Sequence, residues 1–135
     1  MKSTLQPGLA KTVTYTVPRE STIDFMGEEG RVYATPFLVR DIEMAARALL
    51  LEHADPGEDS VGTRVAIDHI GATLLGMTVT LTVRIAAVEG RAVRFSVEGS
   101  DSVEPIVRGE HSRFVVDVAK TAQRLAAKAQ KAGLK

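Results

Sequence analysis

The chain has 135 residues, the size of a single domain with a sizeable core, and its 17 Lys and Arg balance its 17 Asp and Glu. Balanced charge gives no general attraction to nucleic acid or to an anionic membrane, so we expect neither as a partner. With no cysteine there are no disulfides, no thiolate nucleophile and no thiolate metal site. The chain begins without an apolar signal segment and has no stretch long and uncharged enough to span a membrane, which predicts a cytoplasmic protein with one domain, residues 1–135.

A first strand is expected over residues 9–17, where Val, Thr and Tyr are frequent and Val13, Tyr15 and Val17 share one parity. Residues 18–34 then follow with little periodicity. Loops of this length are often lids over binding sites, and this one has an apolar tip formed by Ile23, Phe25 and Met26.

Residues 35–53 are predicted to form the helix around which the rest of the chain is organised. Thr35 is expected as its N-cap and Pro36 as its first helical residue. Apolar side chains occur in almost every direction around this segment, as in a helix buried on most faces. Four charged residues inside it argue against a membrane span, namely Arg40, Asp41, Glu43 and Arg47.

Glu43 shares one stripe of this helix with Arg40 and Arg47, three residues before it and four after it. One interpretation is an ion pair on the solvated edge of the helix. The other is a carboxylate held at the mouth of a pocket.

Four further strands are expected over residues 62–73, 78–88, 91–101 and 106–118. His69 shares its parity with Val65 and Ile67 and should therefore face the covered side of the sheet. The last strand changes parity, and a bulge near Gly109 would explain this. Residues 119–135 are expected to form an amphipathic basic helix. The order predicts an α+β fold, a long central helix wrapped by a five-stranded antiparallel sheet, with a C-terminal helix.

The order of elements and the residues at their junctions resemble the hot dog fold, and within it the fluoroacetyl-CoA thioesterase family, from about Val32 to Val116. The matching segments, in chain order, are Val32–Thr35, Glu43, Pro56–Thr63, His69 with Ala72–Thr73, Gly76–Thr80, Val88–Arg91 and Gly109–Arg113.

The resemblance implies a threonine at the helix entry, a glutamate on the helix and a histidine on the next strand as catalytic residues, which are here Thr35, Glu43 and His69. It implies Gly62 and Arg113 as residues that line the acyl pocket, and a homodimer with active sites at the subunit interface. A carboxylate, an imidazole and a hydroxyl can hydrolyse a thioester without a thiolate. Whether Glu43 is the nucleophile or the general base stays open. Each residue also has a structural alternative, since Thr35 could serve only as a cap, Gly62 only in a turn and His69 only in the core.

No cofactor is expected besides the coenzyme A of the substrate, and no metal, because the three histidines lie on separate elements. No glycine-rich phosphate loop joins a strand to a helix. Candidates for contact with the CoA phosphates are Arg64, Arg84, Lys120 and Arg124, although a solvated basic face is the alternative for the last two.

The resemblance does not extend to fluoroacetyl selectivity. In the family this selectivity is associated with an aromatic lid between the first strand and the helix, and here Phe25 is the only Phe of the corresponding loop.

The main hypothesis is an acyl-CoA thioesterase for a small acyl group. The second is a hot dog protein that binds acyl-CoA or a small acid without turnover. An enoyl-CoA hydratase is a weaker third hypothesis, because the Asp-x-x-x-x-His motif of that branch is missing at the helix.

Overall fold

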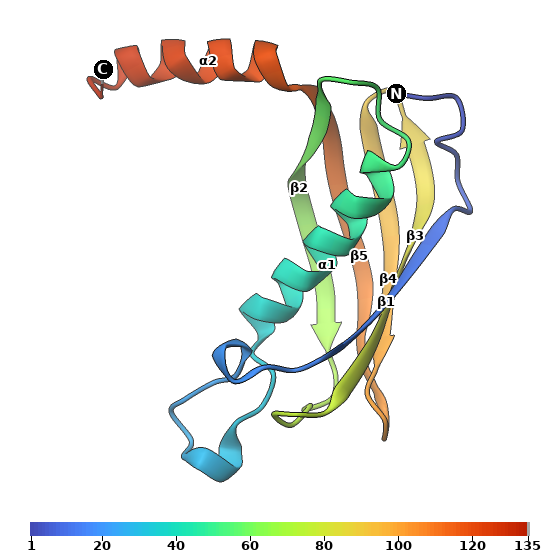
Figure 1. Cartoon of the computed structure of the whole chain (residues 1–135), viewed down its shortest axis with the longest axis vertical. Helices are drawn as coiled ribbons and strands as arrows, with labels where there is room; N and C mark the ends of the chain where they lie inside the picture. The colour runs from blue at the N-terminus through green and yellow to red at the C-terminus, as the bar shows by residue number, and fades with distance from the viewer. Residues whose placement is uncertain (135) are drawn as a thin grey trace.

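The computed structural model describes residues 1–134, in which a curved antiparallel sheet wraps around one long helix (Figure 1). The strands are β1 (Ala10–Thr16), β2 (Glu58–His69), β3 (Thr78–Glu89), β4 (Ala92–Ser100) and β5 (Pro105–Asp117). The helices are α1 (Thr35–Leu51) and α2 (Val118–Lys131), and two short 3-10 turns, Arg19–Ser21 and Glu28–Gly30, lie between β1 and α1. The α+β class, the five antiparallel strands and both helices are confirmed.

The five strands form one sheet in the order β1-β3-β4-β5-β2. The chain leaves α1 and enters β2 at the far edge of the sheet, so β2 pairs with β5 only. One side of β2 therefore remains unpaired among the described residues, and β2 lies beside α1 (Figure 1). The candidate site lies along these two elements.

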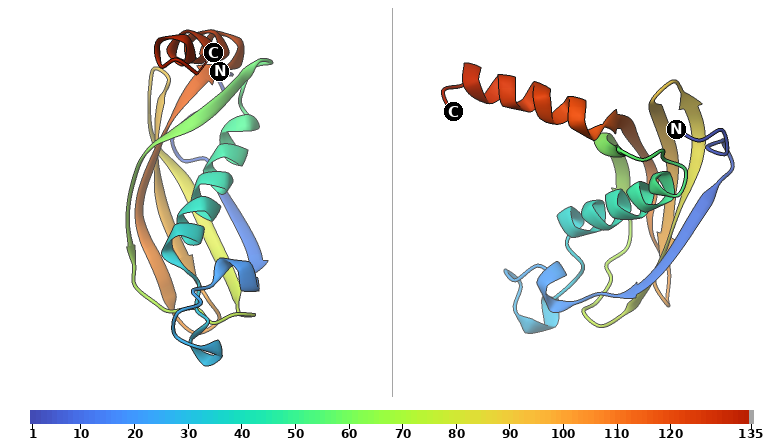
Figure 2. Two further views of the ribbon diagram at one scale, coloured as in Figure 1. Left: turned by 90° about the vertical axis from the view of Figure 1, so that its left-hand side faces the viewer. Right: turned by 45° about the horizontal axis from the view of Figure 1, so that its top comes forward.

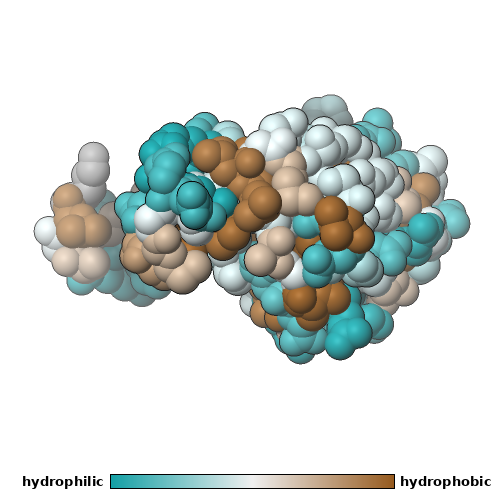
Figure 3. Space-filling view, turned by 90° about the horizontal axis from the view of Figure 1, so that it is seen from below, coloured by the Kyte–Doolittle hydropathy of each residue, from teal (hydrophilic) through white to brown (hydrophobic). Residues whose placement is uncertain are grey.

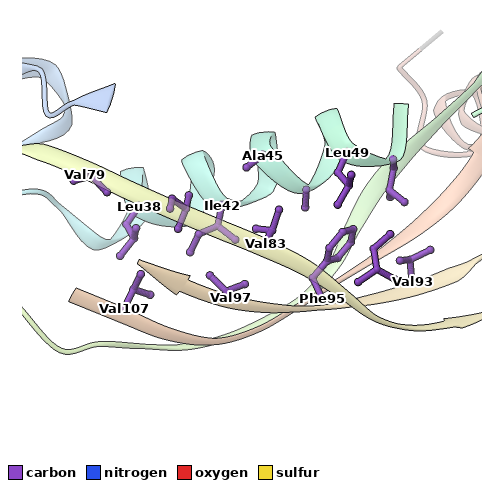
Figure 4. Packing of buried hydrophobic residues seen from close by; sticks show 14 of the residues in the cluster. Leu38, Ile42, Ala45, Leu49, Val79, Val83, Val93, Phe95, Val97 and Val107 are labelled. Atoms are coloured by element: carbon purple, nitrogen blue, oxygen red, sulfur yellow. The ribbon is translucent and has the colours of Figure 1, made fainter. Parts of the chain in front are cut away.

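The core fills the space between α1 and the concave face of the sheet (Figure 4). From the helix, Leu38, Ile42 and Leu49 point toward β3, β4 and β5, and the first two are fully buried. Each such side chain stabilises the fold by about 1.5–3 kcal/mol. Their partners on the sheet include Val79, Val83, Phe95, Val97 and Val107. The core thus fixes α1 rigidly over the sheet.

The helix start differs from the prediction. Ala34 is the N-cap and Thr35 is already helical, because the N–H of Leu38 donates to the carbonyl of Ala34 over 3.1 Å. The side chain of Thr35 makes no capping bond and is free for a tertiary contact. The helix ends at Leu51, two residues before the predicted end at His53.

The predicted bulge at Gly109 is wrong, because β5 continues through Gly109 in regular register with both neighbours. The irregularity lies across the ladder in β2, where Gly62 pairs with Arg113 and Arg64 with Ser112. Phe114 is on the outer face and 42% exposed, whereas His111 and Arg113 are buried on the inner face. The expected bulge follows from assigning the apolar residues of β5 to the covered face. In the structure, the polar residues His111 and Arg113 take covered positions instead.

Helix α2 leaves the sheet and projects away from the rest of the molecule (Figure 2). The Asp117 side chain caps it by accepting a hydrogen bond from the N–H of Lys120 over 3.0 Å. None of its residues is buried, and Lys135 lies outside the described residues. No helix in the described part of the chain has the length and apolar character needed to cross a membrane.

Candidate active site

Thr35 and His69 meet at the start of α1. Their Oγ1 and Nδ1 atoms lie 2.8 Å apart in a hydrogen bond, and the ring of Tyr33 stands edge-on to the imidazole with 6.4 Å between centroids. Nε2 of His69 is buried and has no hydrogen-bond partner within residues 1–134. Burial lowers the pKa of His69, which favours the neutral imidazole. This ring nitrogen is therefore covered in the single chain and left without a partner among the described residues.

A chain of hydroxyl groups holds this end of the helix. The Tyr33 hydroxyl donates to the carboxylate of Asp41, and the Tyr15 hydroxyl donates to Tyr33 over 2.8 Å. Burial raises the pKa of Tyr33 and raises that of Tyr15 to about 12, so both remain neutral donors. The contacts tie β1 and the segment before α1 to the helix. Tyr15 lies 18 residues before Tyr33, and Asp41 lies 8 residues after it, so no local pattern indicates these contacts.

An open groove of about 320 Å³ runs past Thr35 and His69. The other residues along it are Ile23, Val32, Tyr33, Ala34, Ile70, Gly71 and Ala72. Of the predicted lid tip, only Ile23 reaches this groove, because Phe25 is 76% exposed and Met26 60% exposed. The end of the molecule that carries this loop shows separate apolar patches among polar residues (Figure 3). The groove is therefore uncovered in the single chain.

Glu43, Gly62 and Arg113 form a second group. The Arg113 Nη1 atom lies 3.5 Å from Oε2 of Glu43 and donates to the backbone carbonyl of Glu43, also at 3.5 Å. Arg113 is 3% exposed, whereas the Glu43 side chain is 34% exposed and reaches the surface. Burial lowers the pKa of the Arg113 guanidinium, and the carboxylates of Glu43 and Asp59 oppose this. The structure thus shows a carboxylate at the surface that is held from below by a buried cation.

The interpretation of Glu43 as an ion-pair partner of Arg40 or Arg47 on the helix is wrong. Arg47 instead makes a two-bond contact with Asp59, with Nε and Nη2 donating over 2.9 and 2.7 Å. Glu43 pairs across the fold with a strand residue. Helical spacing alone cannot predict this partner.

Ser60 and His111 complete the surroundings of Arg113, and sequence reasoning missed both. Arg113 donates from Nε to Oγ of Ser60 over 2.7 Å and from Nη2 to the Ser60 carbonyl over 2.8 Å. Its Nη1 lies 3.2 Å from Nε2 of His111. Polar residues two apart in β5, His111 and Arg113, were the signal that could have revealed a polar inner face.

The bulge in β2 has a functional consequence. Gly62 and His69 are seven positions apart, and in a regular strand an odd separation puts side chains on opposite faces. The extra residue Thr63 reverses the alternation, so that Gly62 pairs with Arg113 and Val65 with His111. Both Gly62 and His69 consequently face α1.

The two groups do not touch within one chain. No hydrogen bond or ion pair among residues 1–134 joins Thr35 or His69 to Glu43 or Arg113. On α1, Glu43 lies about 12 Å along the axis from Thr35. The five site residues are thus brought together as a pair and a trio.

Two of the four cations considered for the CoA phosphates lie beside a groove of about 440 Å³. Lys120 and Arg124 line it together with Phe114 and Val116 from the outer face of β5. Arg64 faces Glu110 at 3.6 Å, and Arg84 donates to the carbonyl of Gly8. No three His, Asp or Glu side chains within residues 1–134 are arranged to hold a metal ion.

Comparisons with known proteins agree with this architecture. Residues 17–119, which include all five site residues, match the family described as fluoroacetyl-CoA-specific thioesterase. The fluoroacetyl-CoA thioesterase of Streptantibioticus cattleyicolor is 33% identical over 127 residues, covering 89% of this chain and 91% of that protein.

Solved structures give the same result. The fluoroacetyl-CoA thioesterase FlK superposes with a TM-score of 0.85 at 31% identity, covering 92% of this chain and 97% of that chain. A variant of FlK in complex with fluoroacetate and CoA gives a TM-score of 0.81 at 32% identity, covering 87% and 99%. A thioesterase superfamily member from Thermus thermophilus shares the fold, with a TM-score of 0.88 at 24% identity. The match covers 98% of this chain and 99% of that chain. The chain has the hot dog fold and belongs to the fluoroacetyl-CoA-specific thioesterase family.

Proposed function

We propose that this chain is an acyl-CoA thioesterase that hydrolyses small acyl-CoA thioesters to the free acid and CoA. The observation that carries the proposal is the family match over residues 17–119 together with two side-chain groups in that range, Thr35 with His69 and Glu43 with Gly62 and Arg113. A variant of FlK has been solved with fluoroacetate and CoA, which supports CoA thioesters as the substrate class. A CoA substrate and a chain without cysteine also fit a cytoplasmic enzyme, and we include that location.

Each residue has a role that follows from its contacts. The carboxylate of Glu43, partly exposed and against Arg113, attacks the thioester carbonyl or activates the water that does so. The neutral His69 ring can take up a proton from the attacking water at its unpartnered Nε2 and pass it to the CoA thiolate that leaves, and Thr35 orients the ring through Nδ1. Gly62 leaves room beside Glu43, and Arg113 fixes the carboxylate. The roles need neither a metal nor a further cofactor.

The test measures release of free CoA with a thiol reagent, to which the protein itself contributes no thiol. Glu43→Gln and His69→Ala should each lower kcat at least about 100-fold. Glu52→Gln is the matched control, because Glu52 directly follows α1 and pairs with Lys11 at the surface. Equal rates in wild type and both site variants would overturn the proposal. Tight acyl-CoA binding with no turnover in wild type would instead identify a binding protein.

The acyl group should be small, with little preference for fluorine. The groove beside His69 has no aromatic cover, since Phe25 points into solvent. A pocket that discriminates by one small substituent gains about tenfold at the lower end of the usual range. We expect kcat/KM for acetyl-CoA and fluoroacetyl-CoA to agree within about tenfold, and a large preference for fluoroacetyl-CoA would contradict this part of the proposal.

We further propose a homodimer in which the pair of one protomer faces the trio of the other. β2 has an unpaired edge, and Val61 and Ile70 on or next to it are 48% and 47% exposed. A twofold axis between the two groups would place Thr35 and His69 of one protomer opposite the partner's Glu43. The catalytic groups would then meet across the interface, although Thr35 and Glu43 of the same chain lie about 12 Å apart along α1.

Mixed dimers test this arrangement. Glu43→Gln and His69→Ala chains are unfolded together, refolded and assayed, with light scattering to confirm the dimer. A random mixture should recover about a quarter of the wild-type rate, because half of the dimers are hybrids with one intact site each. Hybrid dimers without activity would show that each site lies within one chain.

A further inference from the structure

His111 is a fully buried histidine to which the proposed chemistry gives no role. It lies on the inner face of β5 and stacks on Phe95 from β4 with 6.1 Å between ring centroids. A buried histidine in an apolar core usually satisfies its ring nitrogens through backbone groups. Here only one nitrogen does so, and the other faces Arg113.

The contacts of the ring define its protonation. Nδ1 lies 2.8 Å from the carbonyl oxygen of Arg64, which can only accept, so Nδ1 carries a hydrogen. Nε2 lies 3.2 Å from Nη1 of Arg113, which can only donate, so Nε2 is the acceptor. Both contacts are satisfied by a neutral ring with its hydrogen on Nδ1.

Nη1 of Arg113 is also the nitrogen that faces Glu43. It lies 3.5 Å from both Oε2 and the backbone carbonyl of Glu43, while Nε and Nη2 are held by Ser60. Ser60 thus anchors one side of the guanidinium and His111 the other. The remaining N–H of Nη1 faces Glu43, whose backbone carbonyl accepts a hydrogen bond and whose Oε2 lies at the same distance.

We propose that His111 is a positioning residue for the hydrolysis, which holds Nη1 of Arg113 where it orients the Glu43 carboxylate. This inference rests on the proposed thioesterase function and deepens it by adding Ser60 and His111 behind Arg113. A protonated ring would present an N–H to the N–H of Arg113 and break the contact. The charged groups that face the ring are Arg113 on β5 and Glu43 on α1, and burial lowers the pKa of His111, in agreement with the neutral form.

Two substitutions separate positioning from folding. In His111→Asn the amide nitrogen can still donate to the Arg64 carbonyl, but the shorter side chain does not reach Arg113. In His111→Gln the amide oxygen can replace Nε2 as acceptor. We expect kcat to fall about 10- to 100-fold in the Asn variant with KM within about threefold of wild type, and the Gln variant to recover most of kcat.

His53→Asn is the control, because His53 lies beyond the far end of α1 and bonds to Thr4. Equal kcat in wild type and His111→Asn, or equal loss in the Asn and Gln variants, would overturn the proposal. If wild type releases no CoA, the proposed function fails separately, and NMR of the Arg113 side chain then tests the contact. Its Nη1–H signal should be protected from exchange in wild type and His111→Gln and lose protection in His111→Asn, while the Nε–H that Ser60 holds stays protected in all three. Equal protection of the Nη1–H signal in all three proteins would overturn the inference.

Discussion

Gly62 lies directly against the carboxylate of Glu43. A Cβ atom at position 62 would stand 2.9 Å from Oε2 of Glu43 and 3.3 Å from Cε1 of His111. The backbone of Gly62 is not in the left-handed region, so conformational freedom does not explain the glycine. The space that a side chain would take is used by the carboxylate, so the missing Cβ is part of the site.

The variant Gly62→Ala should therefore lower kcat by about 10- to 100-fold, because the added methyl group displaces Glu43 from Arg113. The backbone tolerates alanine, and the free energy of unfolding should change by less than about 1 kcal/mol. Ala66→Ser, on the exposed face of the same strand, is the control. Unchanged kcat in Gly62→Ala would show that the glycine has no part in placing the carboxylate.

Thr35 offers a test that separates catalysis from helix capping. A threonine N-cap typically contributes about 1 kcal/mol to stability, but here Ala34 takes the cap position and the Thr35 hydroxyl bonds to His69. Thr35→Ala should lower kcat at least about tenfold and reduce the free energy of unfolding by less than about 0.5 kcal/mol. Thr35→Ser keeps the hydroxyl and should recover activity. A large loss of stability with normal kcat would restore the capping role.

Thr35 and His69 also show how much could be predicted from the sequence. The helix, the strands and the inward face of His69 follow from local periodicity, and Thr35 stood out through its position before a proline. The partner of the Thr35 hydroxyl could not be predicted in this way, because His69 is 34 residues away. Its tertiary contact takes the place of the expected local cap. Local propensity indicates which groups need partners, but only the packed fold decides which partners they find.

The strand β5 shows the same limit in another form. Its apolar residues Phe114 and Val116 suggested a covered face, yet the bulge in β2 and the buried polar residues reverse that assignment. Because the register of β2 against β5 brings Arg113 to Glu43 across 70 residues, the ion pair could not be derived from helical spacing. The family resemblance supplied Arg113, but it did not supply Ser60 or His111.

Arg113 should not tolerate lysine. The guanidinium makes directed contacts with Ser60, His111 and Glu43, and a lysine ammonium cannot make them from one position. We expect Arg113→Lys to lower kcat about 100-fold and the free energy of unfolding by about 1–3 kcal/mol, because buried acceptors lose their donors. Arg47→Lys is the control, an arginine that binds Asp59 one turn after Glu43. Similar losses in both variants would argue against a special role for Arg113.

The stability of the fold should fall as the pH falls below about 6.5, the ordinary value for histidine. Burial lowers the pKa of both His69 and His111 in the folded chain, so the unfolded chain takes up protons first as the pH decreases. Stability therefore rises with pH through the window between the folded pKa values and about 6.5, and it is fully present above that window. Paired carboxylates such as Asp59 have lowered pKa values and contribute to acid sensitivity only at lower pH.

Urea unfolding at pH 7.5 and 5.5 tests this expectation. Wild type should lose free energy of unfolding between the two pH values, and His69→Gln and His111→Gln should each lose less, because a glutamine cannot take up the proton in the unfolded chain. The double variant should be nearly independent of pH over this range. An equal loss in wild type and the double variant would place the acid sensitivity in other groups and remove the linkage between these two buried rings and folding.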